Sequence, residues 1–403
     1  MRHRLVVVVA VSVVLGAVGV AAGAREAPSR TGRYIVVLKD FVDSPAAVAH
    51  AQAKAQHAQI GFVYGAAIKG YSATLSSAAV DALRSDPRVA AVVADRPVHL
   101  EAQRLPTGIN RVDGERSSTV SGNGTGSVSV DIAIIDTGID TNHPDLNVVG
   151  GVACNGSGYE DRNGHGTHVA GIAAARDNAT GVVGVAPGAR LWAVRVLDAS
   201  GAGSWSNVIC GVDWVTRNAG RIEVANMSLG GSGSKPSRSG CSTGNPPHDA
   251  ICRSVAAGVT YTVAAGNSST NARRVVPAAH DEVITVSALA DFNGKPGGGA
   301  AATCRSDIDD TFANFSNYGS SIDLIAPGVC ISSTYMGEGY KTLSGTSMAS
   351  PHVAGAAALH KASHPGASPW QVRSALRSAA NLNWNNVDDP DGTKEPLLNV
   401  DAL

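Results

Sequence analysis

Three short segments of this 403-residue chain supply an acid, a histidine and a serine, the side chains that nucleophilic acyl transfer needs. Asp136 directly follows an apolar run, His165 stands between two glycines, and Ser347 follows a Gly-Thr turn. A serine hydroxyl is weakly nucleophilic at neutral pH, so a histidine that titrates at about pH 6.5 must take its proton, and a carboxylate can orient that histidine. Taken alone, each residue could instead be structural: a turn acid, a hydrogen-bonded histidine or a helix cap.

A metal site is a second interpretation of the middle segment. His165 and His168 are three residues apart, which suits two ligands on one helix. The common zinc-binding helix has the pattern His-Glu-x-x-His, and glycine rather than glutamate follows His165. We therefore favour a general base over a zinc ligand at this position.

The elements that must position these residues follow from the apolar pattern beyond residue 128. Short β-branched runs alternate with helical stretches, which predicts βαβ units, a mostly parallel sheet and helices on both of its faces. In such an α/β fold the carboxyl ends of the strands gather the chemistry, and Asp136 follows one of them. The runs cover residues 130–135, 191–197, 222–227, 259–263 and 283–286, and the helices cover 205–216 and 252–257.

A smaller unit precedes this region. The pattern predicts the order strand, helix, strand, helix, strand, which fits a small α/β open sandwich. Residues 100–110 contain few apolar side chains and are expected to form an exposed linker. We expect a first domain over residues 25–104, linker included, and a second over 105–403. The predicted strands of the small unit are 34–38, 71–75 and 89–93, and its helices are 46–58 and 78–84.

Residues 1–24 have the pattern of a secretory signal peptide. A basic start is followed by an apolar run over residues 5–20 and by small residues at 21–24. A membrane anchor is the alternative, but it needs roughly 20 apolar residues. We expect an exported, extracellular protein without a membrane partner once the signal is removed.

Composition narrows the function classes. With 32 Lys and Arg against 33 Asp and Glu the net charge is −1, so no polybasic surface is expected to attract nucleic acid. The six cysteines allow 15 pairings, and an exported protein can oxidise all of them. We expect pairing in chain order, and no cysteine lies beside His165 or Ser347. The cysteines are Cys154, Cys210, Cys241, Cys252, Cys304 and Cys330.

In this order, the three segments resemble the signature blocks of the subtilisin-like serine proteases. The matching stretches are Asp136-Thr137-Gly138, His165-Gly166-Thr167-His168 and Gly345-Thr346-Ser347-Met348-Ala349, and the resemblance extends over everything after about residue 105. It implies a serine endopeptidase that works through an acyl-enzyme, with Ser347 as nucleophile, His165 as base and then acid, and Asp136 as the orienting carboxylate. It also implies that Asn267 donates to the oxyanion beside the Ser347 backbone N–H.

The resemblance further implies a cleft that holds an extended peptide. One edge should pair with the substrate backbone, and two walls should enclose the P1 side chain. These segments contain no acid, so a large neutral or apolar P1 residue is expected; Trp205 either covers a further subsite or packs at a helix start. The implied residues are Gly201, Ala202 and Gly203 for the edge, and Ser228, Leu229, Gly230, Ala264, Ala265 and Gly266 for the walls.

Calcium is the cofactor that the resemblance implies, in a structural role. The hard ion prefers oxygen ligands, and the segment after His165 has the length of the family's calcium loop. An ordinary surface loop is the alternative. A second site, similar to one in the proteinase K branch, would use Asp281, Val283 and Asp323, although the cysteine positions differ from those of that branch. The ligands implied for the first site are Asp145 and Asn178 by side chain, and Arg176, Thr180 and Val182 by carbonyl oxygen.

The small unit resembles the inhibitory prodomain of this family, which opens on a stretch like Tyr34–Leu38. The resemblance implies an autoprocessed zymogen cut near residues 103–106, whose partners are protein or peptide substrates and its own prodomain, and a monomeric mature enzyme. The rival hypothesis is a binding or inhibitory protein that keeps the fold without catalysis. Loss of protein hydrolysis on treatment with a serine-directed reagent would separate the two.

Overall fold

The computed structural model describes residues 31–95 and 102–403. Two compact units make up the chain, Met1–Leu100 and Glu101–Leu403. The signal peptide expected at residues 1–24 lies outside the described residues. Within the described ranges, no helix combines the length and the apolar character that crossing a membrane requires.

The first unit is a four-stranded antiparallel sheet in the order β2-β3-β1-β4 with two helices. Its core is apolar, with Tyr71 at the centre, whose hydroxyl donates to Gln52 Oε1 (2.9 Å). Strand β2 was not predicted, because it is an edge strand whose Phe62 is 65 % exposed. The elements are β1 (Thr31–Leu38), α1 (Pro45–Ala55), β2 (Gln59–Tyr64), β3 (Gly70–Ser76), α2 (Ser77–Arg84) and β4 (Val89–Ala94).

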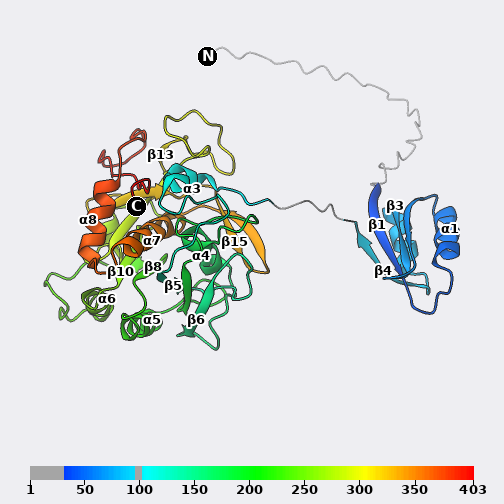
Figure 1. Cartoon of the computed structure of the whole chain (residues 1–403), viewed down its shortest axis with the longest axis horizontal. Helices are drawn as coiled ribbons and strands as arrows, with labels where there is room; N and C mark the ends of the chain where they lie inside the picture. Colours follow the sequence, from blue (N-terminus) through cyan, green and yellow to red (C-terminus); the bar gives the residue numbers. More distant parts are fainter. Residues whose placement is uncertain (1–30, 96–101) are drawn as a thin grey trace, which may run out of the picture. The chain divides into compact units, whose positions relative to one another are not determined.

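The second unit is built on an eight-stranded sheet, ordered β13-β12-β10-β8-β5-β7-β6 with β14 also paired to β12. Every pair in it is parallel except β12 with β13 (Figure 1). The mostly parallel sheet expected from the sequence is therefore confirmed. Its strands are β5 (Asp131–Asp136), β6 (Val148–Ala153), β7 (Arg190–Arg195), β8 (Val224–Met227), β10 (Thr260–Ala264), β12 (Ile284–Ala290), β13 (Thr311–Phe312) and β14 (Leu324–Pro327).

Helices cover both faces of this sheet. Along β5, Ile132 and Ile134 join a core cluster with α4 and α7, whereas Ala133 and Ile135 join a second cluster with α5 and α6. Successive side chains of a strand point to opposite faces, so a run that is apolar throughout requires cover on both. The helices are α3 (Thr107–Arg111), α4 (His165–Ala174), α5 (Trp205–Arg217), α6 (Pro246–Ala256), α7 (Thr346–Ser363) and α8 (Pro369–Ala379).

Short elements complete the unit. Two antiparallel pairs stand apart from the main sheet: β15 and β16, which form a hairpin, and β9 and β11, which are far apart in the chain. Two 3₁₀ turns, η1 and η2, lie in the connections. The bounds are β9 (Gly231–Ser232), β11 (Val275–Val276), β15 (Ile331–Tyr335), β16 (Gly339–Leu343), η1 (Gly114–Arg116) and η2 (Ala272–Arg274).

Two expectations about local structure were wrong. The exposed linker expected over residues 100–110 is shorter, because residues 107–111 form helix α3 and Ile109 is buried in the core. Helix α6 begins at Pro246 rather than at residue 252. Asn245 caps it by accepting from His248 N, and prolines suit the first turn of a helix, where an N–H has no partner.

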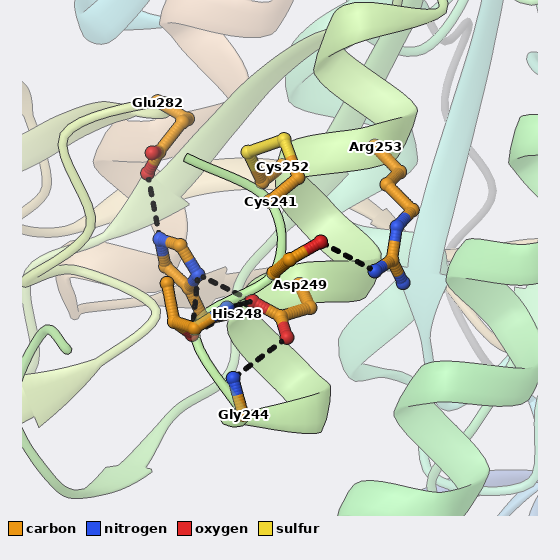
Figure 2. The surroundings of a disulfide bond; sticks show 9 residues. Cys241, Gly244, His248, Asp249, Cys252, Arg253 and Glu282 are labelled. Carbon is orange, nitrogen blue, oxygen red and sulfur yellow. Dashed lines mark hydrogen bonds and ion pairs between the residues drawn. A yellow bond between two sulfur atoms is a disulfide. The ribbon is translucent and has the colours of Figure 1, made fainter. Parts of the chain in front are cut away.

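The six cysteines form three disulfides in chain order: Cys154–Cys210, Cys241–Cys252 and Cys304–Cys330. Figure 2 shows the second one, which ties the turn before α6 to the helix itself. The same turn is held by Asp249, which accepts hydrogen bonds from Thr243 and Gly244 that lower the pKa of its carboxyl. Covalent and polar contacts therefore fix this turn together.

The crossing of α7 with α4 predicts one stability effect. A Cβ added at Gly355 of α7 would lie 2.6 Å from Val185 Cβ and 2.9 Å from the Ala173 carbonyl oxygen. Gly355→Ala should therefore lower the free energy of unfolding by roughly 1–3 kcal/mol, although alanine is the better helix former. Guanidinium unfolding measures the change. Gly366→Ala is the matched control, because nothing lies within 4 Å of its Cβ position, and equal stability of the two variants would contradict the close packing.

Candidate active site

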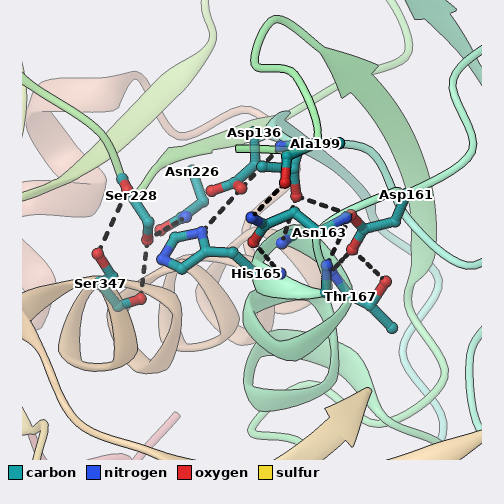
Figure 3. A network of polar contacts seen from close by, with 12 residues as sticks. Asp136, Asp161, Asn163, His165, Thr167, Ala199, Asn226, Ser228 and Ser347 are labelled. Carbon is teal, nitrogen blue, oxygen red and sulfur yellow. Dashed lines mark hydrogen bonds and ion pairs between the residues drawn. The ribbon is translucent and has the colours of Figure 1, made fainter. Parts of the chain in front are cut away.

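Asp136 and His165 meet where β5 ends and α4 begins. Asp136 is the last residue of its strand and is fully buried, and its Oδ1 accepts from His165 Nδ1 (2.8 Å) and from Thr137 N (2.7 Å). His165 is the first residue of its helix, and its side chain is 26 % exposed (Figure 3). The contact orients the imidazole and leaves its Nε2 for another partner.

A second aspartate, Asp161, holds these two elements together. Its carboxylate accepts from Thr137 Oγ1 (2.9 Å), beside Asp136, and from Thr167 N (2.9 Å), in the first turn of α4. It also accepts from the backbone N–H groups of Asn163 and Gly164. The sequence analysis missed this residue. The signal was present, since Asp-x-Asn-Gly before a helix is typical of an Asx turn that supplies a cap.

Ser347 is the second residue of α7, and Figure 3 shows the His165 ring lying between Asp136 and Ser347. The Ser347 hydroxyl donates to the Ser228 carbonyl oxygen (3.3 Å), and Ser228 Oγ donates back to the Ser347 carbonyl oxygen (2.8 Å). The proton of Ser347 therefore points to Ser228 here. Rotation about the Cα–Cβ bond would turn it toward His165, and such contacts commonly tighten only when substrate binds.

Asn226 fixes the relative positions of β8 and α7. Its side chain is fully buried, its Nδ2 donates to Ser228 Oγ (3.0 Å), and its Oδ1 accepts from Thr262 Oγ1 (3.0 Å) and Ser350 Oγ (2.7 Å). Every polar atom of this amide thus has a partner. The sequence offered no sign of the role, because Asn226 lies inside a strand far along the chain from Ser347.

The charge next to His165 changes its titration. Burial acts to lower the pKa of the imidazole, but the Asp136 charge and hydrogen bond, with a smaller effect from Asp161, raise that pKa above its usual value. A base with a raised pKa accepts a proton more readily.

Asn267 lies beside the start of α7. Its Oδ1 accepts from Thr346 N (2.8 Å) and Thr346 Oγ1 (2.9 Å). These two hydrogen bonds fix the orientation of the amide. The Nδ2 group is the remaining donor, and Asn267 lines the same cavity as Ser347. The residue that precedes the serine therefore orients the amide predicted to bind the oxyanion.

Two adjoining cavities share the segment Ser228–Gly231. The larger, of about 760 Å³, contains His165, and the smaller, of about 430 Å³, contains Ser347 and Asn267. None of their lining residues, all within the described range 102–403, is acidic. Of the predicted cleft residues, Gly201, Ala202, Gly203 and Trp205 line the larger cavity, Ala264 and Gly266 line the smaller one, and Ser228, Leu229 and Gly230 line both.

Ala265 is the exception among the predicted cleft residues. Its side chain is fully buried and packs in the cluster formed with α5 and α6. Neighbouring residues of an extended segment point to opposite sides, so Ala264 and Gly266 face the cavity while Ala265 faces the core.

The loop predicted to bind calcium converges on Asp145. This carboxylate is buried, accepts from Asn178 Nδ2 (2.9 Å) and Val182 N (3.0 Å), and its pKa is raised by burial against those two hydrogen bonds. No Lys or Arg pairs with it among the described residues. A buried, unneutralised carboxylate among amides and carbonyls fits a calcium ion.

Gln103 is a further member of this loop that the sequence analysis missed. Its Nε2 donates to the carbonyl oxygens of Arg176 (3.0 Å) and Val182 (3.5 Å), two of the predicted ligands. Its backbone N–H donates to the Ala179 carbonyl oxygen (2.9 Å). The sequence analysis assigned Gln103 to a linker. Only the fold brings it beside Arg176 and Val182, which are 73 and 79 positions away in the chain.

The second predicted metal site does not fit a cation. Asp323 is buried and pairs with Arg373 and Arg377, and Asp281 pairs with Lys235 (2.8 Å). Two guanidinium groups already neutralise the carboxylate that an ion would need. Nor does the structure favour zinc at the other histidine, because His168 Nε2 contacts the carbonyl oxygens of Ile331 and Lys341.

Comparisons with known proteins agree with this geometry. Residues 127–394 match the model of the Subtilase family, and residues 33–101 match Peptidase inhibitor I9. The chain is 38 % identical over 342 residues to Subtilisin E of Bacillus subtilis (strain 168), covering 83 % of this chain and 80 % of the relative. It is 41 % identical over 307 residues to Subtilisin DY of Bacillus licheniformis, and the match covers 75 % of this chain and 99 % of that relative.

A solved structure, described as a cold adapted subtilisin-like serine proteinase, is similar in fold. It shares 36 % sequence identity and a TM-score of 0.57, covering 73 % of this chain and 97 % of that one. The subtilisin-like fold expected for the second unit and the inhibitor-type first unit are thereby confirmed. The chain belongs to the subtilase family of serine endopeptidases and carries an I9 inhibitor domain ahead of its peptidase domain.

Proposed function

We propose that this chain is made as a secreted zymogen whose mature form hydrolyses proteins through an Asp136, His165 and Ser347 triad. The observation that carries the proposal is the 2.8 Å hydrogen bond from His165 Nδ1 to the fully buried Asp136, with Ser347 on the other side of the ring. The charge balance of −1 gives no support to a nucleic-acid partner, and a monomer with protein or peptide substrates is proposed.

The arrangement supplies each step of acyl transfer. Ser347 Oγ attacks the scissile carbonyl carbon while His165 Nε2 takes its proton, and Asp136 stabilises the imidazolium that forms. His165 then gives this proton to the leaving amine, so the C–N bond breaks and an acyl-enzyme ester remains. Water, deprotonated by His165, hydrolyses the ester and returns the proton to Ser347.

Two donors would bind the oxyanion of each tetrahedral intermediate: Asn267 Nδ2 and the backbone N–H of Ser347. Because the Asn267 carbonyl oxygen is held by Thr346, its donor group is oriented before substrate arrives. Donors fixed in advance need no reorganisation as charge develops, which makes them worth more than mobile ones.

The cavity beside Ser347 supports a large neutral or apolar P1 residue. Its walls are small and uncharged, with Ala264, Gly266 and Gly230 among them, and a volume of about 430 Å³ has room for a large side chain. A lysine or arginine side chain would lose its hydration there without meeting an acid. Gly201–Gly203 would pair with the extended substrate backbone along the larger cavity.

The inhibitor domain supports zymogen activation, with a signal peptide over 1–24, a prodomain over 25–104 and the peptidase domain from 105. One observation argues for moving the boundary between these two domains: Gln103 N and Arg104 N both donate to carbonyl oxygens of the loop 179–181. Residues held by the peptidase domain in this way would stay with it. We therefore propose a processing bond on the N-terminal side of Gln103, so that Gln103 and Arg104 belong to the mature peptidase rather than to the prodomain.

A structural calcium ion in the Asp145 loop is part of the proposal. Asp145, Asn178 and Gln103 would bind it by side chain, and Arg176, Thr180 and Val182 by carbonyl oxygen. The ion would supply the positive charge that the buried Asp145 lacks, and so stabilise the loop. It plays no part in the acyl-transfer steps.

The nucleophile is tested first. Ser347→Ala should abolish hydrolysis of casein and leave the inhibitor domain covalently attached, because the same hydroxyl would perform the processing cut. Activity is measured on the purified secreted protein, and processing by mass spectrometry. Ser344→Ala, which changes a nearby hydroxyl outside the triad, is the control. Residual protein hydrolysis by the Ser347 variant would refute the triad, and hydrolysis absent from the wild-type protein as well would favour a non-catalytic binding protein.

Asn267→Ala tests the oxyanion donor. Turnover should fall by roughly 10²–10³, a loss known for such donors in this family, with KM little changed because the bond forms mainly in the transition state. Steady-state kinetics on a peptide amide separate kcat from KM. Equal kcat in variant and parent would remove Asn267 from the reaction.

Asp145→Asn tests the calcium loop. An ion that binds only the folded chain stabilises it by about 2.7 kcal/mol at a hundredfold excess over Kd. Excess chelator should therefore shorten the thermal inactivation half-life of the parent more than that of the variant, while the initial rate at low temperature stays unchanged. Asp213→Asn, an exposed helix position, is the control. A parent half-life that is the same in chelator and in calcium would show an ordinary surface loop.

A further inference from the structure

The loop between Trp384 and Leu397 collects three carboxylates away from the catalytic cleft. One carboxylate oxygen each from Asp389, Asp391 and Glu395 lies within 4.8 Å of the other two. The loop is well anchored at its ends, where Trp384 Nε1 donates to the Glu395 carbonyl oxygen (2.9 Å) and Leu397 N donates to the Asn381 carbonyl oxygen (2.8 Å). The carboxylates are therefore held together by the fold.

Glu395 is the informative member of this group. Its side chain is only 3 % exposed, yet neither carboxylate oxygen has a hydrogen-bond partner in another residue. Asp389 Oδ2 is likewise buried without a partner. Buried polar atoms are nearly always satisfied, and an unpaired buried carboxylate is among the costliest exceptions. The site therefore lacks a partner that should be positive or a strong donor.

No side chain in the neighbourhood supplies that partner. Among the described residues, no Lys or Arg forms an ion pair with any of the three carboxylates. The adjacent Lys394 places its ammonium over the Trp384 ring (5.7 Å to the centroid), and Arg111 is committed to Asp291 and Asp310. The negative charge of the loop is left uncompensated by protein groups.

A further unpaired oxygen belongs to the same loop. Asn386 Oδ1 is buried and has no partner, while the Nδ2 of the same amide donates to the Gly392 carbonyl oxygen (3.1 Å). This contact folds the Asn386 side chain onto the loop that contains Asp389 and Asp391. The unpaired atoms are thus all oxygens, and all belong to acceptors.

We propose that this loop is a second, independent divalent-cation site, of the calcium class, whose side-chain ligands are Asp389, Asp391 and Glu395. Calcium takes six to eight oxygens at about 2.3–2.6 Å, so oxygens on opposite sides of one ion are separated by up to about 5 Å. The observed 4.8 Å limit accommodates such an ion at the centre of the group. Water and loop carbonyls complete the coordination sphere.

The test is calcium titration by calorimetry on the full chain with Ser347→Ala, which prevents self-digestion. Adding Glu395→Gln should remove one bound calcium ion per chain, whereas adding Glu338→Gln, an exposed glutamate changed in the same way, should remove none. Adding Asp145→Asn separates the two sites, because an ion held by Asp389, Asp391 and Glu395 must remain in that variant. Terbium luminescence excited through tryptophan gives an independent readout, since Trp384 lies beside Glu395.

Thermal unfolding distinguishes ligation from a structural role of Glu395. In chelator, Glu395→Gln should unfold at the same temperature as its parent or higher, because a buried carboxyl is replaced by a neutral amide of the same shape. In calcium, the parent alone should gain the contribution of this site. Equal calcium stoichiometry in the Glu395 variant and its parent, or a variant that is less stable in chelator, would overturn the proposal.

Discussion

The structure depends on one buried negative charge, the carboxylate of Asp136. It sits at the end of a fully buried strand, and a charge there is tolerated only when donors surround it. Thr137 N and His165 Nδ1 both donate to Oδ1, whereas Oδ2 is buried without a partner, so these two donors carry the whole task. Asp161 holds both donors in place through Thr137 Oγ1 and the first turn of α4. The requirement to satisfy this carboxylate therefore fixes the junction of strand and helix on which the chemistry relies.

The sequence predicted what periodicity and composition control. The apolar run before Asp136 indicated a strand covered on both faces, and Ile132 and Ile135 do pack in separate clusters. What it could not predict depends on contacts between distant segments. Asn226 and Gln103 have ordinary local contexts, and only the fold places them beside residues far along the chain. Strand β2 was not predicted for another reason: it is an exposed edge strand and lacks a clear apolar pattern.

The two acidic loops differ in how their charges are balanced. Asp145 accepts hydrogen bonds from two amide donors, so the protein itself partly satisfies it, whereas neither carboxylate oxygen of Glu395 has a hydrogen-bond partner and two other carboxylates lie near it. Asp323 is balanced in a third way, because two arginines pair directly with its buried carboxylate. These three environments explain why an acid in the sequence does not identify a metal site: the neighbours decide, and they come from other elements.

The hydrogen bonds between Asn267 and Thr346 link two functions proposed for this site, nucleophilic attack and oxyanion binding. Thr346 is the residue before Ser347 on α7, so a small displacement of that helix end shifts the proposed nucleophile, Ser347, and the proposed oxyanion donor, Asn267, in the same direction. The distance between Ser347 and Asn267 therefore depends little on the loops around the cleft. Selection can reshape the cavity walls at Ala264 or Gly230 for new side chains without readjusting the distance on which bond cleavage depends, which makes the scaffold tolerant of diversification.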